Sequence, residues 1–260
     1  MAESGAMIDP LPKSLRILCF GDSLTAGYTS YGWEFHPYAD HLRVGLQHTL
    51  SISDIEVDVA GLSGDQVQGS YLPRIRAKCA NTDSPYDWII IMGGTNDLAW
   101  GQSPDTIYEG LSKPSLPLPR YLSISFCGSS PLFTPTPFQD SAVANWIVTE
   151  KVWKVALDTG ANVLALNVLE ADGSGDRVNS KRNSLNDKIA NHQQERFYSF
   201  DIYSAIRYTG IDKDLREKLW DDGLHLTSEG YKVMGDVIAV RMLELLKMTQ
   251  QPKNIGPIPN

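Results

Sequence analysis

Short apolar runs separated by helical stretches are the feature that most constrains how this chain of 260 residues folds. Runs of this length, alternating with amphipathic stretches, are typical of the strands of a parallel sheet. The run Trp-Ile-Ile-Ile-Met at 88–92 is apolar throughout, which predicts a central strand buried on both faces. The predicted strands are residues 15–20, 55–60, 88–92, 163–168 and 197–200.

Two helical patterns are clear enough to assign a buried face. Residues 38–50 place Leu42, Leu46 and Leu50 four residues apart, on one side of a helix. The last helix is expected to begin at Thr227, a residue type that caps helices. Its expected apolar face comprises Val233, Val237, Val240 and Leu243.

The block at 112–150 does not fit this alternation. It is rich in Ser and Pro and has no sustained period, and a structureless loop of this length is uncommon inside a domain. Without it, the helical pattern of 105–111 would continue into 151–153, so we interpret the block as an insertion. A lid, a passive surface excursion and translated intron sequence remain open interpretations. We expect one domain over 1–250 and a flexible tail at 251–260.

Charge and composition exclude several classes of partner. The formal charge of −8 and the pI near 5.1 disfavour nucleic-acid binding, which needs clustered Lys and Arg. The three cysteines form no disulfide or metal-binding pattern, and no metal or cofactor motif is found. The chain shows no secretory leader and no apolar stretch long enough to span a membrane. We therefore expect a cytoplasmic protein without a cofactor, nucleic-acid partner or stable membrane insertion, and the oligomeric state stays open.

Ser23 follows directly on the first predicted strand, within Gly21-Asp22-Ser23-Leu24. Open α/β sheets bind their ligands at the carboxyl ends of the strands, so this serine lies where a nucleophile is expected. The same residues would also suit a helix cap or a simple turn. This motif alone does not decide between the two.

Asp222 precedes His225 by three residues, just before the last predicted helix. The intervening Gly223 lets the backbone turn tightly, so the carboxylate can reach one ring nitrogen and leave the other free. A histidine oriented in this way can take a proton from a serine hydroxyl. Asp221 is an alternative orienting acid, although the spacing favours Asp222. A second alternative leaves Asp222 at the helix dipole and His225 in solvent.

Glycine-rich turns follow the second and third predicted strands. They contain Gly64 and Gly94-Thr95-Asn96-Asp97, respectively. Glycine permits a close approach of backbone to a ligand, and Asn96 offers a side-chain amide. Ordinary turns use the same residue types, so either turn alone would indicate little. Together the four motifs indicate a site, because they occur in the order expected if they converge on one sheet edge.

In this order the four motifs resemble the GDSL or SGNH hydrolase superfamily. The matching blocks are Gly21-Asp22-Ser23-Leu24, Gly64 within Ser63-Gly64-Asp65, Gly94-Thr95-Asn96-Asp97 and Asp222-Gly223-Leu224-His225. The resemblance implies a flavodoxin-like, three-layer α/β/α sandwich with a five-stranded parallel sheet. It also implies that Ser23 is the nucleophile, His225 the general base and Asp222 the acid that orients it. The implied oxyanion hole consists of the Ser23 and Gly64 N–H groups and the Asn96 amide.

The function that this resemblance implies is a serine ester hydrolase that forms an acyl-enzyme with small or medium esters. The opening segment 17–25 is similar to arylesterase-like members. Alternatives are a thioesterase, lysophospholipase or carbohydrate O-deacetylase of the same superfamily, or a non-catalytic binding protein on this fold. The absence of a G-x-S-x-G motif disfavours the α/β-hydrolase fold.

Aromatic residues close to the motifs have two interpretations. They could form the wall of an apolar substrate pocket, or they could pack within a long first loop. Packing is the favoured interpretation for each residue taken singly. These residues are Tyr28, Tyr31, Trp33, Phe35 and Trp100.

Overall fold

Five parallel strands form the central sheet of the computed structural model, which describes residues 14–50, 52, 54–80, 83–112 and 151–249. The strands are β1 (Ser14–Gly21), β4 (Asp54–Gly61), β5 (Trp88–Met92), β6 (Asn162–Leu166) and β7 (Phe197–Phe200). Their order, β4-β1-β5-β6-β7, is that of a flavodoxin-like sheet. The predicted parallel α/β fold is therefore confirmed, although the fourth strand ends at Leu166 instead of residue 168.

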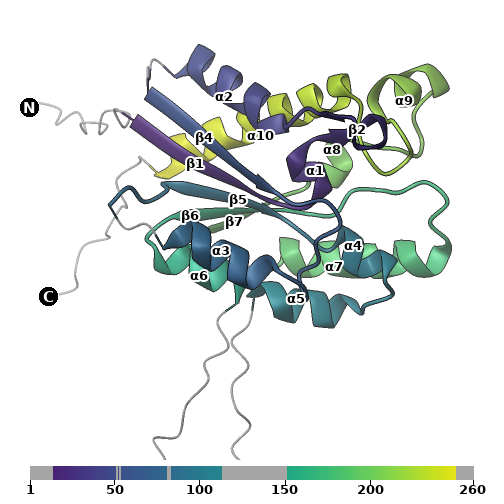
Figure 1. Ribbon diagram of the computed structural model, residues 1–260, viewed down its shortest axis with the longest axis horizontal. Helices are drawn as coiled ribbons and strands as arrows, with labels where there is room; N and C mark the ends of the chain where they lie inside the picture. Colours follow the sequence, from purple (N-terminus) through teal and green to yellow (C-terminus); the bar gives the residue numbers. More distant parts are fainter. Residues whose placement is uncertain (1–13, 51, 53, 81–82, 113–150, 250–260) are drawn as a thin grey trace, which may run out of the picture.

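Helices cover both faces of the sheet (Figure 1). Helices α2 and α10 lie on one face, and α3, α5, α6 and α7 lie on the other. Side chains of β1 alternate between the two layers: Ile17 and Cys19 pack beneath the first, whereas Leu18 and Phe20 pack beneath the second. The helices are α1 (Ser23–Ala26), α2 (Tyr38–Thr49), α3 (Tyr71–Cys79), α4 (Thr95–Ala99), α5 (Pro104–Ser112), α6 (Val152–Asp158), α7 (Asp176–Ala190), α8 (Ile202–Ala205), α9 (Lys213–Leu219) and α10 (Ser228–Thr249).

A small antiparallel hairpin follows α1. It pairs β2 (Tyr28–Thr29) with β3 (Glu34–Phe35) through a 3-10 turn at Ser30–Gly32. Sequence analysis treats this stretch as a loop, because strands of two residues are too short to show a period. The hairpin lies at the carboxyl edge of the sheet, close to the motif that contains His225.

Helix α10 buries a different face from the one predicted. Val240 is 60% exposed, and Val233, Val237 and Leu243 are only partly buried. The prediction was wrong because valines and methionines alternate around this helix, so two apolar stripes have helical spacing. The buried stripe consists of Tyr231, Met234, Ile238, Met242 and Leu245. The predicted face of α2 is confirmed, since Leu42, Leu46 and Leu50 are all buried.

Helices α5 and α6 lie on either side of the predicted insertion. Both contribute to the same buried cluster, through residues that include Ile107 and Trp153, and they follow one another along the same face of the sheet (Figure 1). Ser112 ends α5, and its hydroxyl donates to the Tyr108 carbonyl. The rest of the block at 112–150, and the tail at 251–260, lie outside the described residues.

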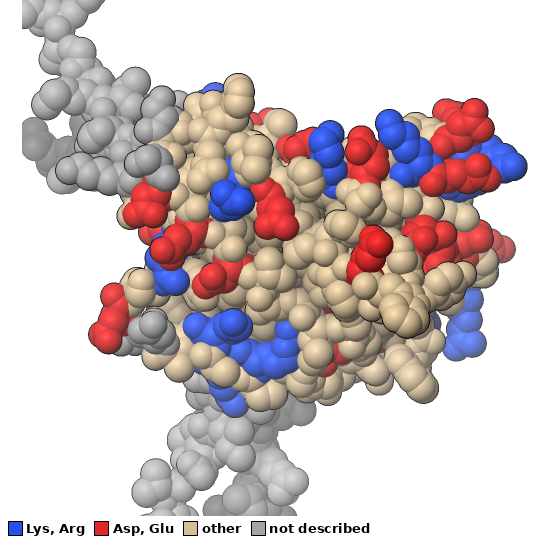
Figure 2. Space-filling model, turned by 45° about the horizontal axis from the view of Figure 1, so that its top comes forward, with Lys and Arg blue, Asp and Glu red and all other residues tan. Residues whose placement is uncertain are grey.

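The described residues carry charges of both signs. Figure 2 shows basic and acidic side chains interspersed around α9, which has the sequence KDLREKL. Within the described ranges, no helix combines the length and the apolar character needed to cross a membrane.

Candidate active site

Ser23 begins a helix of one turn at the end of β1. The Asp22 carboxylate caps this helix by accepting the Leu24 N–H at 3.0 Å. A Cβ at Gly21 would lie 2.2 Å from the Thr25 hydroxyl and 2.7 Å from the Met92 carbonyl, so glycine is required there. This close approach turns the chain sharply and places Ser23 at the carboxyl edge of the sheet.

A hydrogen-bonded relay links Ser23 to the last motif. His225 Nε2 lies 2.9 Å from Ser23 Oγ, and His225 Nδ1 lies 2.8 Å from Asp222 Oδ2. Asp222 Oδ1 accepts the N–H groups of Leu224, at 3.0 Å, and of His225, at 2.7 Å. Gly223 has φ of 82°, and its Cβ would lie 2.5 Å from Asp172, so the turn needs glycine. The structure thus brings the three predicted catalytic side chains together.

The Asp222 carboxylate is held in its ionised form. Partial burial opposes ionisation, but the hydrogen bonds from the His225 ring and from the backbone of His225 and Leu224 lower its pKa below the ordinary value. A carboxylate at this position fixes the proton on Nδ1 and leaves Nε2 free to accept one from Ser23. The Tyr28 ring packs against the imidazole, with 4.4 Å between ring centroids.

Asp221 has a different set of partners from Asp222. Its Oδ2 accepts the Ser30 N–H at 2.7 Å and the Thr29 hydroxyl at 3.2 Å. These bonds tie the hairpin β2–β3 to the turn that contains His225. In this geometry the Asp221 carboxylate anchors the hairpin, whereas the Asp222 carboxylate bonds the His225 ring.

The two glycine-rich turns also meet beside Ser23. Asn96 Nδ2 donates to the Asp65 carbonyl at 2.9 Å, and the Leu62 N–H donates to the Gly21 carbonyl at 3.1 Å. Gly64 lies between these two bonds in the chain and has φ of 78°. A primary amide has two N–H groups, so one can fix the Asn96 side chain while the other serves a ligand.

Three further residues position the turn around Gly64, and sequence analysis gave them no role. Arg74 donates to the Asp65 carboxylate and to the Ala60 carbonyl, each at 2.5 Å. Asp97 accepts the N–H groups of Val67 and Gln68. Asp65 and Asp97 stand inside the recognised motifs, whereas nothing near Arg74 in the sequence signals its function.

Asp22 is completely buried, and this raises the pKa of its carboxyl to about 7, mainly through the loss of hydration. The folded protein then keeps a proton between about pH 4 and 7 that the unfolded chain has released. The contribution of Asp22 to stability therefore falls as the pH rises through this window, by up to about 1.4 kcal/mol per pH unit. We expect Asp22→Asn, which cannot ionise, to gain stability relative to wild type from pH 4 to 8. Urea unfolding of both proteins measures this difference, and a difference independent of pH would contradict the raised pKa.

A cavity of about 370 Å³ borders the relay. It lies beside Asn96 and Asp222, and the loop 171–175 after β6 forms one wall. Its apolar lining comes from Leu98, Ala99, Val168, Leu169, Val178 and Leu224. Polar side chains, Arg182 among them, lie on α7 and on the loop. This mixture suits an organic ligand with a polar group.

The aromatic residues near Ser23 do not line this cavity. Tyr31, Trp33 and Trp100 are 84%, 88% and 76% exposed, so the favoured interpretation as packing residues is wrong for them. Phe35 is 52% exposed but stacks edge-on with Tyr28. Tyr28 packs against the His225 ring of the relay.

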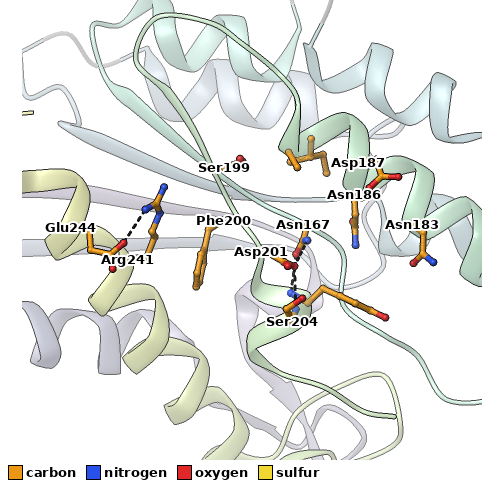
Figure 3. A pocket seen from close by; sticks show the side chains of 13 residues that line it. Asn167, Asn183, Asn186, Asp187, Ser199, Phe200, Asp201, Ser204, Arg241 and Glu244 are labelled. Atoms are coloured by element: carbon orange, nitrogen blue, oxygen red, sulfur yellow. Dashed lines mark hydrogen bonds and ion pairs between the residues drawn. The ribbon is translucent and has the colours of Figure 1, made fainter. Parts of the chain in front are cut away.

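A larger cavity, of about 730 Å³, lies beyond β7 (Figure 3). Its side chains come from α7, β7, α8 and α10 and from the loop residues Asn167 and Asp201. Several of them pair: Arg241 bonds Glu244, and Asp201 bonds both Asn167 and Ser204. None of the predicted catalytic residues lines it. We therefore associate the chemistry with the smaller cavity. Within the described residues, no group of three His, Cys, Asp or Glu side chains is arranged to hold a metal ion.

A flavodoxin-like sheet with these four motifs at its carboxyl edge defines the SGNH class of hydrolase folds. The sequence model of the GDSL-like lipase/acylhydrolase family matches residues 19–233, a range that contains all four motifs. The chain belongs to this family.

Several solved structures have the same fold at low sequence identity. A lipase/acylhydrolase from Enterococcus faecalis is 19% identical with a TM-score of 0.58, over 92% of this chain and 99% of that one. A G-D-S-L family lipolytic protein from Veillonella parvula is 19% identical with a TM-score of 0.57, over 89% of this chain and 98% of that one. A carbohydrate esterase family 3 protein from Talaromyces cellulolyticus is 14% identical with a TM-score of 0.55, over 90% of this chain and 99% of that one. No curated protein sequence matches the chain.

Proposed function

We propose that this chain is a carboxylic ester hydrolase with Ser23 as nucleophile, His225 as general base and Asp222 as the acid that orients it. The observation that carries the proposal is the relay of two hydrogen bonds, 2.8 Å from Asp222 to His225 and 2.9 Å from His225 to Ser23. Family membership supports the reaction class, since its members are lipases and acylhydrolases.

Acylation begins when Ser23 Oγ attacks the ester carbon and His225 Nε2 takes the hydroxyl proton. The carbonyl electrons move onto oxygen, which becomes an oxyanion. When the tetrahedral intermediate collapses, the bond to the alcohol breaks and His225 returns the proton to the leaving oxygen. Water then repeats the sequence on the acyl-enzyme, releasing the acid and regenerating Ser23.

The oxyanion hole would consist of the Ser23 and Gly64 N–H groups and the Asn96 amide. Donors that are already fixed in place are usually the largest catalytic term, because they need no reorganisation as charge develops. Asp65, Arg74 and Asp97 supply this rigidity by holding the Gly64 turn from both sides.

Asn96→Ala tests this hole. We expect kcat to fall by about 100- to 1,000-fold with little change in KM, since the amide stabilises the transition state more than the bound ester. Steady-state kinetics with p-nitrophenyl acetate measures both constants. Gln68→Ala removes a side-chain bond from the same loop to the Thr106 carbonyl, and an equal loss in that variant would instead assign the effect to loop structure.

Substrate size is proposed from the cavity. Its volume of about 370 Å³ is near the lower end of the range for ligand pockets, which favours small or medium esters over long acyl chains. Hydrolysis of p-nitrophenyl esters from acetate to palmitate by the full chain tests the activity and the size limit together. We expect turnover to peak at short chains. Turnover of sugar acetates by a folded protein that is inert towards the whole series would favour the carbohydrate O-deacetylase alternative.

A further inference from the structure

Arg182 is a buried cation without a carboxylate partner. The residue is 6% exposed and stands on α7. Its Nη1 donates to Asn179 at 2.8 Å and its Nη2 to Asn183 at 3.3 Å, and both acceptors are neutral amide oxygens. The guanidinium also stacks on Tyr203, with 4.9 Å to the ring centroid. None of the ion pairs among the described residues includes it, and its buried Nε has no hydrogen-bond partner.

A buried charge without an opposite charge is costly for a protein. A guanidinium has five N–H donors, and only two of those on Arg182 are used by the asparagines. A packing or hydrogen-bonding role alone would be served by an uncharged side chain. The reason for a positive charge at this position is therefore sought in the cavities that Arg182 lines.

The nearby carboxylates are already engaged. Glu170, which is 4% exposed, accepts from the backbone N–H groups of Tyr208 and Thr209 and from two hydroxyls. Arg207 lies 3.8 Å from it and supplies its counter-charge. Asp172 accepts the N–H of Gly173 and lies beside the Tyr208 hydroxyl. These contacts engage both carboxylates with the loops after β6 and α8; both line the adjoining cavity with Arg182, and neither forms an ion pair with it.

Arg182 lines the cavity that borders the relay. It also lines an adjoining cavity of about 280 Å³, and the two cavities share residues 171–174 of the loop after β6. The Asp172 N–H bonds the Gly223 carbonyl at 2.7 Å, so this loop packs directly on the turn that contains Asp222 and His225. One cavity is thus lined both by Asn96, beside the relay, and by Arg182.

From this arrangement we infer that Arg182 is a substrate-binding residue that recognises an anionic group, a carboxylate on one side of the ester, and so makes the enzyme prefer anionic esters. The inference rests on the proposed ester hydrolase activity. A guanidinium suits this role because its planar fork pairs with a carboxylate through two parallel hydrogen bonds. The formal charge of −8 repels anions in general, so a preference for them requires a local group of this kind.

The test compares anionic esters with neutral esters of the same shape. On the acyl side the pair is p-nitrophenyl hydrogen adipate and its terminal amide. On the alcohol side it is 4-acetoxybenzoate and 4-acetoxybenzamide. For each pair the ratio of kcat/KM, anionic over neutral, is measured in wild type and in Arg182→Met. We expect the ratio for one pair to fall by about 10- to 100-fold in the variant, as for the loss of a charge-assisted hydrogen bond.

This ratio separates recognition from folding, because both esters of a pair meet the same enzyme preparation. Arg182→Lys keeps the charge and is expected to retain part of the preference. Arg177→Met is the matched control: Arg177 is an exposed arginine on α7 that lines neither cavity. We expect its ratio to equal that of wild type.

Two results would overturn the inference. One is a ratio that Arg182→Met leaves unchanged for both pairs in a protein that hydrolyses p-nitrophenyl acetate. The other is an equal fall in Arg177→Met. If no ester at all is hydrolysed, the proposed function fails, and calorimetry with 4-hydroxybenzoate and adipate still decides the inference. Binding of either anion by wild type and its loss in Arg182→Met would support the inference, and no binding of either would reject it.

Discussion

Replacement of Ser23 by alanine is expected to lower kcat for p-nitrophenyl acetate by about 10⁴- to 10⁶-fold while the protein stays folded. The serine oxygen is the atom that forms the covalent bond, and no other described hydroxyl lies at His225 Nε2. Without it, only the positioning of water by the remaining groups would accelerate hydrolysis. The structural cost is small, because alanine removes one hydrogen bond, worth about 1 kcal/mol.

The measurement is a comparison of steady-state kinetics and thermal unfolding in wild type, Ser23→Ala and Ser184→Ala. Ser184 is an exposed serine on α7, so its replacement controls for the loss of a hydroxyl elsewhere. We expect Ser184→Ala to match wild type in both measurements. Activity of Ser23→Ala within tenfold of wild type would show that another group is the nucleophile.

The sheet could be predicted from the sequence because its three central strands, β1, β5 and β6, are buried on both faces. Runs such as residues 88–92 contain only apolar side chains, and the turns after them contain glycine and polar residues. The order of strands follows from family resemblance and not from the runs themselves. Local periodicity was a weaker guide on α10, where two apolar stripes compete, and on α7, whose sequence is mostly polar.

In the candidate site, residues that are close in sequence could be predicted together, whereas residues that act through distant segments could not. Asp222 and His225 are close in sequence, and a turn at Gly223 brings them together, so their pairing could be predicted. Arg74 and Arg182 could not be found in this way. Arg74 reaches the distant Gly21 carbonyl, and the cavities that Arg182 lines are formed by segments that are distant in the chain. In the sequence, a buried arginine such as Arg182 looks the same as a solvent-exposed one. The hydrophobic pattern of a mostly polar helix does not show which of its charged side chains are buried.

Asp222→Asn is expected to lower kcat by about 10³- to 10⁴-fold, although it alters only one atom. Asp222 Oδ1 accepts two backbone N–H groups, so an asparagine would keep its oxygen there and direct its NH2 towards His225 Nδ1. That nitrogen would then have to accept a hydrogen bond, which moves the ring proton to Nε2. A protonated Nε2 donates to Ser23 and cannot take its proton.

Asp221→Asn is the matched control, because the two residues are adjacent in the chain and the Asp222 carboxylate, unlike that of Asp221, bonds the His225 ring. Asp221 Oδ2 accepts from Ser30 and Thr29, so its variant weakens the anchoring of the hairpin and leaves the tautomer of His225 unchanged. We expect its kcat to stay within about tenfold of wild type, since positioning effects on an exposed loop are smaller than loss of the base. Kinetics at pH 7 for both variants distinguishes the roles. A larger loss in Asp221→Asn than in Asp222→Asn would assign the orienting carboxylate to Asp221 and overturn the relay proposed from the geometry.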